Sequence, residues 1–199
     1  MREVLISILR DKNTTTFEFR RAASQLAGIL CVETLDLFPK EGVSIQTPIG
    51  KTEGVEMPID ILLVPILRSG MALLSAFLEI LQSAPVGIIG LKRDEKTAKA
   101  KLYYKNLPKD LPKYAIILDP MLATGGSAAF AVDILKKEGY KPENIFFTGV
   151  VAAQEGFDKL AKKIPEENIT LGVIDPKLND KKYIVPGLGD FGDRYFNTI

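Results

Sequence analysis

The pattern of apolar positions differs between the chain before residue 61 and the chain after it. Between residues 17 and 35 apolar side chains recur at spacings of three and four, which predicts an amphipathic helix. Asn13 or one of the threonines at 14–16 can serve as its N-cap. Residues 43–57 alternate around Pro48-Ile49-Gly50, which predicts a strand pair or hairpin.

From residue 61 onward, short continuous apolar runs alternate with amphipathic stretches. Continuous runs are typical of strands that are buried on both faces. Charged residues 92–109, rich in Lys and Tyr, have no apolar period and predict an exposed loop or arm. The predicted strands are 61–67, 86–91, 114–118, 145–152 and 169–174, and the predicted helices run from Ser69-Gly70 to about 82, from about 127 to 138 and from 155 to 163.

Strands that alternate with helices indicate βαβ units, so we expect an α/β fold with a mostly parallel sheet flanked by helices. The length of 199 residues suits one domain, 1–199. Within it we expect an N-terminal helical part of about 1–42, a core of about 43–175 and an irregular C-terminal segment of about 176–199. Sheets of this kind bind ligands at the carboxyl ends of their strands.

Composition removes several classes of function. The net charge of +1 argues against a generic nucleic-acid binder. The chain has no histidine and one cysteine, which excludes Ser-His-Asp and Cys-His catalysis and a structural zinc site. Cys31 is expected to be a core residue. No run approaches 18 uncharged apolar residues, so we expect a soluble cytoplasmic protein with no nucleic-acid or membrane partner.

The most informative stretch follows the predicted strand 114–118. Asp119 ends the strand, and a short loop leads through Thr124-Gly125-Gly126-Ser127 into a helix. Glycines let the backbone approach a ligand, and free N–H groups at a helix start favour a phosphate. The Walker and dinucleotide patterns are both absent. The stretch therefore predicts a phosphate loop, with a glycine-rich helix start that binds nothing as the alternative.

Here the sequence resembles the uracil phosphoribosyltransferase family. Residues 119–127 (DPMLATGGS) resemble that family's loop for phosphoribosyl pyrophosphate (PRPP). The resemblance covers nearly the whole chain from Arg10, in six ordered motifs. The other five are RDKNT with FR (10–14, 19–20), TPIGKT (47–52), VPILRSG (64–70), GLKRD with YY (90–94, 103–104) and YIVPGLGDFGDR (183–194).

The resemblance implies a type I phosphoribosyltransferase fold, with a β-arm or flexible loop and a C-terminal hood over the base. It implies that the loop cradles the ribose 5-phosphate, and that Arg68 and Arg93 bind pyrophosphate, Arg93 on an arm that closes over the site. Catalytic roles are expected for Arg68, Arg93, Asp119 and Asp190. The loop residues expected to bind substrate are Asp119, Pro120, Met121, Leu122, Ala123, Thr124, Gly125, Gly126 and Ser127.

The same resemblance places uracil on the C-terminal segment. Contacts are expected at Ile184, Gly189, Asp190 and Phe191, mostly through main chain that matches the acceptor–donor–acceptor edge of uracil. Phe191 stands where many relatives have Ala, and we expect it to narrow the pocket or to shift the turn. No direct protein metal site is expected. PRPP would carry Mg²⁺, with Asp190 as the candidate contact.

The implied reaction is transfer of the phosphoribosyl group from PRPP to uracil, giving UMP and pyrophosphate in pyrimidine salvage, a pentosyltransferase reaction. The family also implies a homodimer or homotetramer, and some members are activated by GTP. Two alternatives stay open from the sequence. One is a transferase of the same fold that acts on another base. The other is a regulator that senses PRPP or nucleotide without turnover.

Overall fold

A computed structural model describes residues 1–57, 60–93 and 100–198, with the side chain of Arg93 outside that description. The helices are α1 (Arg2–Arg10), α2 (Thr16–Leu35), α3 (Met71–Ile80), α4 (Gly126–Lys137), α5 (Gln154–Ala161) and α6 (Phe191–Phe196). The strands are β1 (Glu41–Gln46), β2 (Lys51–Glu56), β3 (Ile61–Leu67), β4 (Ile88–Arg93), β5 (Ala100–Asn106), β6 (Tyr114–Leu118), β7 (Met121–Leu122), β8 (Ile145–Ala153), β9 (Ile169–Asp175), β10 (Lys177–Leu178) and β11 (Ile184–Val185).

The long helix α2 begins at a complete capping box. The Thr15 hydroxyl accepts a hydrogen bond from the Glu18 amide, and the Glu18 carboxylate accepts one from the Thr15 amide at 3.0 Å. These reciprocal bonds satisfy backbone donors that a helix start would otherwise leave unpaired. The predicted helix and its N-cap among the threonines are therefore confirmed.

A seven-stranded sheet forms the centre of the molecule. Its order is β5-β4-β3-β6-β8-β9, and the short β7 continues beside β8 beyond the end of β6. Among the described pairings of this sheet, only that between β4 and β5 is antiparallel. The predicted mostly parallel α/β fold is confirmed. From β3 the chain continues to β4 on one side, and from β6 to β8 on the other, so a topological switch point lies between β3 and β6.

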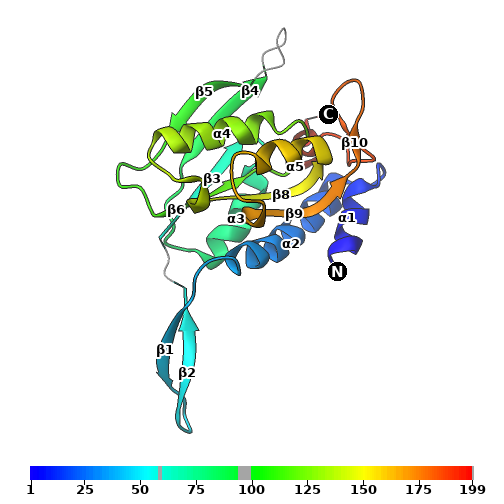
Figure 1. Cartoon of the computed structure of the whole chain (residues 1–199). Helices are drawn as coiled ribbons and strands as arrows, with labels where there is room; N and C mark the ends of the chain where they lie inside the picture. Colours follow the sequence, from blue (N-terminus) through cyan, green and yellow to red (C-terminus); the bar gives the residue numbers. More distant parts are fainter. Residues whose placement is uncertain (58–59, 94–99, 199) are drawn as a thin grey trace.

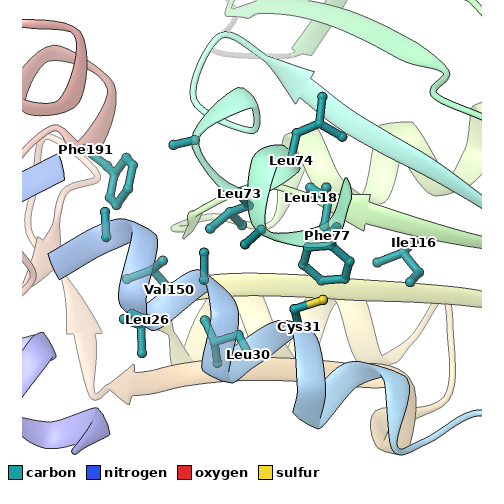
Figure 2. Close-up of a cluster of buried hydrophobic side chains, with 14 of the residues drawn as sticks. Leu26, Leu30, Cys31, Leu73, Leu74, Phe77, Ile116, Leu118, Val150 and Phe191 are labelled. Carbon is teal, nitrogen blue, oxygen red and sulfur yellow. The ribbon is translucent and has the colours of Figure 1, made fainter. Parts of the chain in front are cut away.

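Helices cover both faces of this sheet (Figure 1). Helices α1, α2 and α3 pack on one face, and α4 and α5 pack on the other. Figure 2 shows the first of these cores, where Leu30 and Cys31 of α2 face Leu73 and Phe77 of α3. Cys31 is fully buried, as predicted, and burial raises the pKa of its thiol to about 12. It is a packing residue and not a reactive thiol.

Two predicted irregular segments contain regular structure. Residues 100–106, expected to be loop or arm, form the edge strand β5 against β4. The segment after residue 176 contains the small antiparallel pair β10–β11 and the short helix α6. Edge strands and one-turn helices bury too few side chains to impose an apolar period, which is why the pattern missed them.

The predicted hairpin is confirmed and projects away from the body of the molecule (Figure 1). Strands β1 and β2 pair in antiparallel register, from Glu41 opposite Glu56 to Gln46 opposite Lys51. Ile45, Ile49 and Val55 on this hairpin are exposed. Across the described ranges, none of the helices is both long and apolar enough to cross a membrane.

Candidate active site

The site lies at the switch point, where β3 and β6 end side by side. Pro65 of β3 is in register with Leu118 of β6, so the residues that follow both strands emerge at the same sheet edge. Arg68 follows β3 and Asp119 follows β6. The hydroxyl of Ser69 donates to the Asp119 carboxylate at 3.2 Å, which ties the two strand ends together. The Leu67–Arg68 peptide bond is cis.

The predicted phosphate loop has the backbone of an anion cradle. Residues 121–128 line a small cavity of about 80 Å³ at the N-terminus of α4. Gly125 is the N-cap of α4 and has a φ of 68°, a conformation that favours glycine. A Cβ atom there would lie 2.7 Å from the carbonyl oxygen of Gly156 at the start of α5. The loop is thus packed backbone against backbone, with the amides of a helix start around a hollow suited to a phosphate.

Pro120 and Leu122, two of the predicted loop residues, are buried. The carbonyl oxygen of Pro120 accepts the amides of Val150 and Val151 at 3.0 Å each. Leu122 is 1% exposed and packs among the side chains under α4. These two residues anchor the loop to the sheet, whereas Ala123 and Ser127 also line the larger cavity beside it.

Asp119 is a buried carboxylate with few compensating contacts. It is 7% exposed, and it accepts hydrogen bonds from Ser69 and, at 3.4 Å, from the Met121 amide. Burial raises the pKa of Asp119 to about 7, against the opposing effect of these two bonds. Perturbed carboxylates of this kind cluster at functional sites, and the group lines a cavity where ligand hydroxyls could donate to it.

A larger cavity of about 420 Å³ joins the sheet edge to the C-terminal segment. Arg68, Asp119 and Ser127 line one side, and Ile184 and Asp190 line the other. A neighbouring cavity of about 440 Å³ contains Gly189 and shares Asp190. The structure therefore brings predicted phosphate-binding residues, Arg68, Asp119 and Asp190, and the predicted base-binding residues Ile184 and Gly189 to neighbouring cavities that share lining residues.

Arg68 points toward the C-terminal segment. Its Nη2 atom donates to the Asp193 carboxylate at 2.9 Å, and its guanidinium carbon lies 5.3 Å from the centre of the Phe196 ring. The Arg68 side chain is 55% exposed, so N–H groups of its guanidinium that do not contact Asp193 can donate to a ligand. Arg93, the second predicted arginine, ends β4, and its side chain lies outside the described residues.

The C-terminal turn carries two glycines with positive φ, 60° at Gly187 and 82° at Gly189, after a cis Val185–Pro186 bond. Asp190 caps α6 by accepting the amide of Asp193 at 2.9 Å. The predicted base-binding stretch 184–191 therefore runs from the two-residue strand β11 to the first residue of the short helix α6. Ile184 and Asp190 line the larger cavity, and residues 186–190 line the neighbouring one.

Of the two expectations for Phe191, the narrowing of the pocket is wrong, and the shift of the turn stays a prediction. Phe191 is fully buried, and its ring packs edge-on against Phe19 of α2 at 5.1 Å and stacks on Tyr195 at 5.8 Å. Its ring lies in the core (Figure 2), and Phe191 lines neither cavity, so it does not narrow the pocket. A large apolar ring gains more from burial against α2 than from exposure in a polar cleft.

Several cavity residues escaped prediction. Lys181 and Lys182 line the larger cavity, and Ser69 holds Asp119. Tyr183, the first residue of the 183–194 motif already linked to the base, lines the larger cavity as well. The two lysines lie on the β10–β11 turn, directly before the 183–194 motif, and a basic pair beside such a motif was the available signal. Charged turn residues are common on any surface, so their proximity to Arg68 becomes visible only in the fold.

Within the described residues, no group of three or more His, Cys, Asp or Glu side chains could hold a metal ion. The cavity does offer the single carboxylates of Asp119 and Asp190. Mg²⁺ commonly binds through one or two carboxylates together with substrate phosphates and keeps several waters. This donor set therefore fits a magnesium ion brought in by a pyrophosphate ligand.

Together, a parallel sheet with a phosphate loop after β6 and an arginine turn after β3 defines a type I phosphoribosyltransferase. A solved hypoxanthine-guanine phosphoribosyltransferase from Bacillus anthracis shares this fold, with a TM-score of 0.51 and 11% identity over 80% of each chain. The model of one family, uracil phosphoribosyltransferase, matches residues 2–198. The chain belongs to the uracil phosphoribosyltransferase family.

Individual relatives agree with that assignment. A uracil phosphoribosyltransferase from Finegoldia magna is 48% identical over 195 residues, which cover 97% of this chain and 92% of the relative. The solved structure of the AQ2163 protein from Aquifex aeolicus is 36% identical, with a TM-score of 0.85 over 98% of this chain and 93% of that one. The similarity therefore includes the N-terminal helices and the C-terminal segment as well as the sheet.

Proposed function

We propose that this protein transfers the 5-phosphoribosyl group of PRPP to uracil, producing UMP and pyrophosphate in pyrimidine salvage. One observation carries the proposal: the residues after β3 and β6, the phosphate loop and the segment 184–190 line neighbouring cavities that share lining residues. A reaction between a phosphorylated sugar and a base requires such a juxtaposition, because both reactants must be held in line at the sugar carbon C1.

The loop at the start of α4 is proposed to hold the 5-phosphate. Backbone amides around Gly125 and Gly126 and the hydroxyls of Thr124 and Ser127 supply donors without a buried cation. Asp119, two residues before the cradle, is proposed to accept hydrogen bonds from the ribose hydroxyls in its ionised form. Those bonds would replace hydrogen bonds that its buried carboxylate lacks in the free protein.

Arg68 is proposed to bind the pyrophosphate through its planar fork, and Arg93 is proposed as the second pyrophosphate ligand. As the bond from C1 to pyrophosphate breaks, positive charge grows on the sugar and negative charge on the leaving oxygen. Fixed donors at the leaving group stabilise that transition state more than the ground state. A bound Mg²⁺, carried on the pyrophosphate and contacted by Asp190, would add charge neutralisation there.

Uracil is proposed to bind against the main chain of Ile184, Gly189, Asp190 and Phe191. Its O2, N3–H and O4 form an acceptor–donor–acceptor edge, which amide and carbonyl groups of a turn can match. Cytosine reverses part of this pattern and would leave buried groups unpaired, which costs more than the loss of an apolar contact.

We also propose that the protein is a homodimer or homotetramer. The β1–β2 hairpin supports this, because it projects from the body of the molecule (Figure 1) and exposes Ile45, Ile49 and Val55. Analytical ultracentrifugation of the intact protein, compared with Ile49→Asp, tests the proposal. GTP activation is carried over from the family as a separate proposal, and assays with and without GTP test it.

The base specificity is tested by incubating purified protein with PRPP, Mg²⁺ and one base at a time, and separating the nucleotides by chromatography. UMP from uracil, with no nucleotide from cytosine, hypoxanthine or orotate, is the expected result. A nucleotide from another base in preference to UMP would contradict the proposal.

A further inference from the structure

One buried ion pair joins three segments that are distant in sequence. Arg10, the last residue of α1, donates from Nη1 and Nη2 to the two carboxylate oxygens of Asp175 at 2.9 and 2.6 Å. Asp175 is the last residue of β9, and its side chain is 5% exposed. The third segment is the turn that holds Gly187, which both partners of the pair contact.

Both backbone polar groups of Gly187 are held by this ion pair. The Gly187 carbonyl accepts from Arg10 Nη1 at 2.9 Å, and the Gly187 amide donates to the Asp175 carboxylate at 2.8 Å. The φ of 60° at Gly187 leaves no room for a side chain, because a Cβ atom would lie 2.2 Å from the Ile184 carbonyl oxygen. The two peptide planes beside Gly187 are therefore fixed relative to the sheet.

The next residue is anchored to the same N-terminal segment. Arg194 donates to the Leu188 carbonyl at 2.7 Å and to the Asp11 carbonyl at 2.6 Å. Arg10 and Arg194 thus occupy the two consecutive carbonyl groups of Gly187 and Leu188. This arrangement determines which backbone groups of the following residues, Gly189 and Asp190, remain for a ligand.

We infer that the Arg10–Asp175 ion pair is the positioning device that sets the base-recognition turn and thereby the discrimination between uracil and cytosine. The inference rests on the proposed function. Main-chain recognition depends on the direction of each peptide plane, because a rotated plane offers the wrong group to the base. Arg10 is 25% exposed and Asp175 5%, and ion pairs out of water gain little net stability over apolar residues of similar size. The two hydrogen bonds to Gly187 are what give this pair an orienting role.

Arg10→Lys tests this role, because lysine keeps the positive charge but cannot form the bidentate hydrogen bonds that Arg10 donates to Asp175. We expect the KM for uracil to rise about tenfold and the uracil-to-cytosine preference to fall by a similar factor, as for loss of one or two hydrogen bonds. The KM for PRPP and the affinity for PRPP alone should stay within twofold. Asp133→Asn is the control, because it removes the Lys163–Asp133 ion pair at 2.7 Å, whose residues line none of the three cavities of the site, and should change neither KM.

A second measurement needs no activity. Hydrogen–deuterium exchange of the peptide covering 184–190 should be slow in the wild type and faster in Arg10→Lys, with the phosphate loop unchanged. An unchanged uracil KM and base preference in folded Arg10→Lys would overturn the inference, and so would equal increases in both KM values. If the wild type makes no UMP, the proposed function fails, whereas an exchange difference confined to the turn still supports the ion pair as its anchor.

Discussion

The guanidinium of Arg68, which lines the larger cavity, and the carboxylate of Asp193, which lines the neighbouring one, lie 2.9 Å apart. Arg68 follows the central strand β3, and Asp193 lies in helix α6, so this pair joins the sheet edge to the C-terminal segment. Both side chains are half exposed, at 55% and 41%, and exposed pairs contribute only about 0–1 kcal/mol to stability. A ligand with several negative charges can therefore displace Asp193 from Arg68.

From this pair we predict that Arg68→Ala strongly lowers the kcat/KM for PRPP and has little effect on the stability of the fold. The free energy of unfolding should change by less than about 1 kcal/mol, because the pair is exposed. The kcat/KM for PRPP should fall by about 10²–10³, as expected for loss of charge-assisted bonds to a pyrophosphate. Arg2→Ala is the matched control, since it breaks another half-exposed pair, with Glu33, and should leave kcat/KM unchanged. A large fall in melting temperature with Arg68→Ala would indicate a structural role.

Asp119→Asn should stabilise the protein at neutral pH. Burial raises the pKa of Asp119 from 3.8 to about 7, so the folded state binds a proton there that the unfolded state has released. The contribution of Asp119 to stability therefore falls as the pH rises from about 4 to 7 and is constant above that range. The difference in melting temperature between Asp119→Asn and the wild type should therefore increase between about pH 4 and pH 7. The corresponding difference in the free energy of unfolding changes by as much as about 4 kcal/mol. A constant difference would contradict the shifted pKa.

The same carboxylate predicts the pH dependence of PRPP binding. Ribose hydroxyls bind the ionised form, so the affinity of the wild type for PRPP should weaken as the pH falls below about 7. Titration calorimetry across this range measures the effect. The 5-phosphate of PRPP also titrates, near pH 6, and it does so with every variant. Asp119→Asn is therefore the control: any pH dependence of PRPP affinity that the wild type shows and this variant lacks is due to Asp119.

Gly125→Ala should damage the phosphate loop through steric overlap as well as backbone strain. Gly125 and Gly139 both have positive φ, at 68° and 109°, but only at Gly125 would an added Cβ atom meet a close neighbour, the Gly156 carbonyl oxygen at 2.7 Å. Gly139→Ala should cost about 1–2 kcal/mol of stability and leave the KM for PRPP unchanged. Gly125→Ala should cost more and raise that KM at least tenfold. Equal effects of the two substitutions would argue that the contact with Gly156 is unimportant.

Lys182→Gly should stabilise the chain while weakening PRPP binding. Lys182 has a φ of 63°, a conformation that costs a non-glycine residue about 1 kcal/mol. Its pairing with Glu155 at 3.7 Å is half exposed and contributes little. Removing a cavity-lining cation should raise the KM for PRPP a few-fold. Lys181→Gly is the control, because it should weaken PRPP binding without raising the melting temperature.

The sheet and most of its helices could be predicted from sequence because their signals are local. Continuous apolar runs predicted β3, β6 and β8, and a strand end followed by Asp119 and a glycine pair located the phosphate loop. Edge strand β5 left no such signal, because its side chains alternate between partly buried and exposed without an apolar face.

The parts that sequence reasoning missed depend on contacts between distant segments. Arg10 and Asp175 are 165 positions apart, and nothing local marks them as partners. The Phe191 side chain occupies the core only because α2 presents Phe19 beside it. A motif can thus locate a turn, while the direction of each side chain in it is decided by the surrounding fold.

The most direct measurement of the central claim is pyrophosphate release from PRPP, followed in parallel with UMP formation, with and without uracil. Transfer to the base predicts one pyrophosphate for each UMP and no release above background when uracil is absent, since water is a poor substitute for a positioned nucleophile. Pyrophosphate release without uracil, or PRPP binding with no UMP at any uracil concentration with or without GTP, would contradict the account.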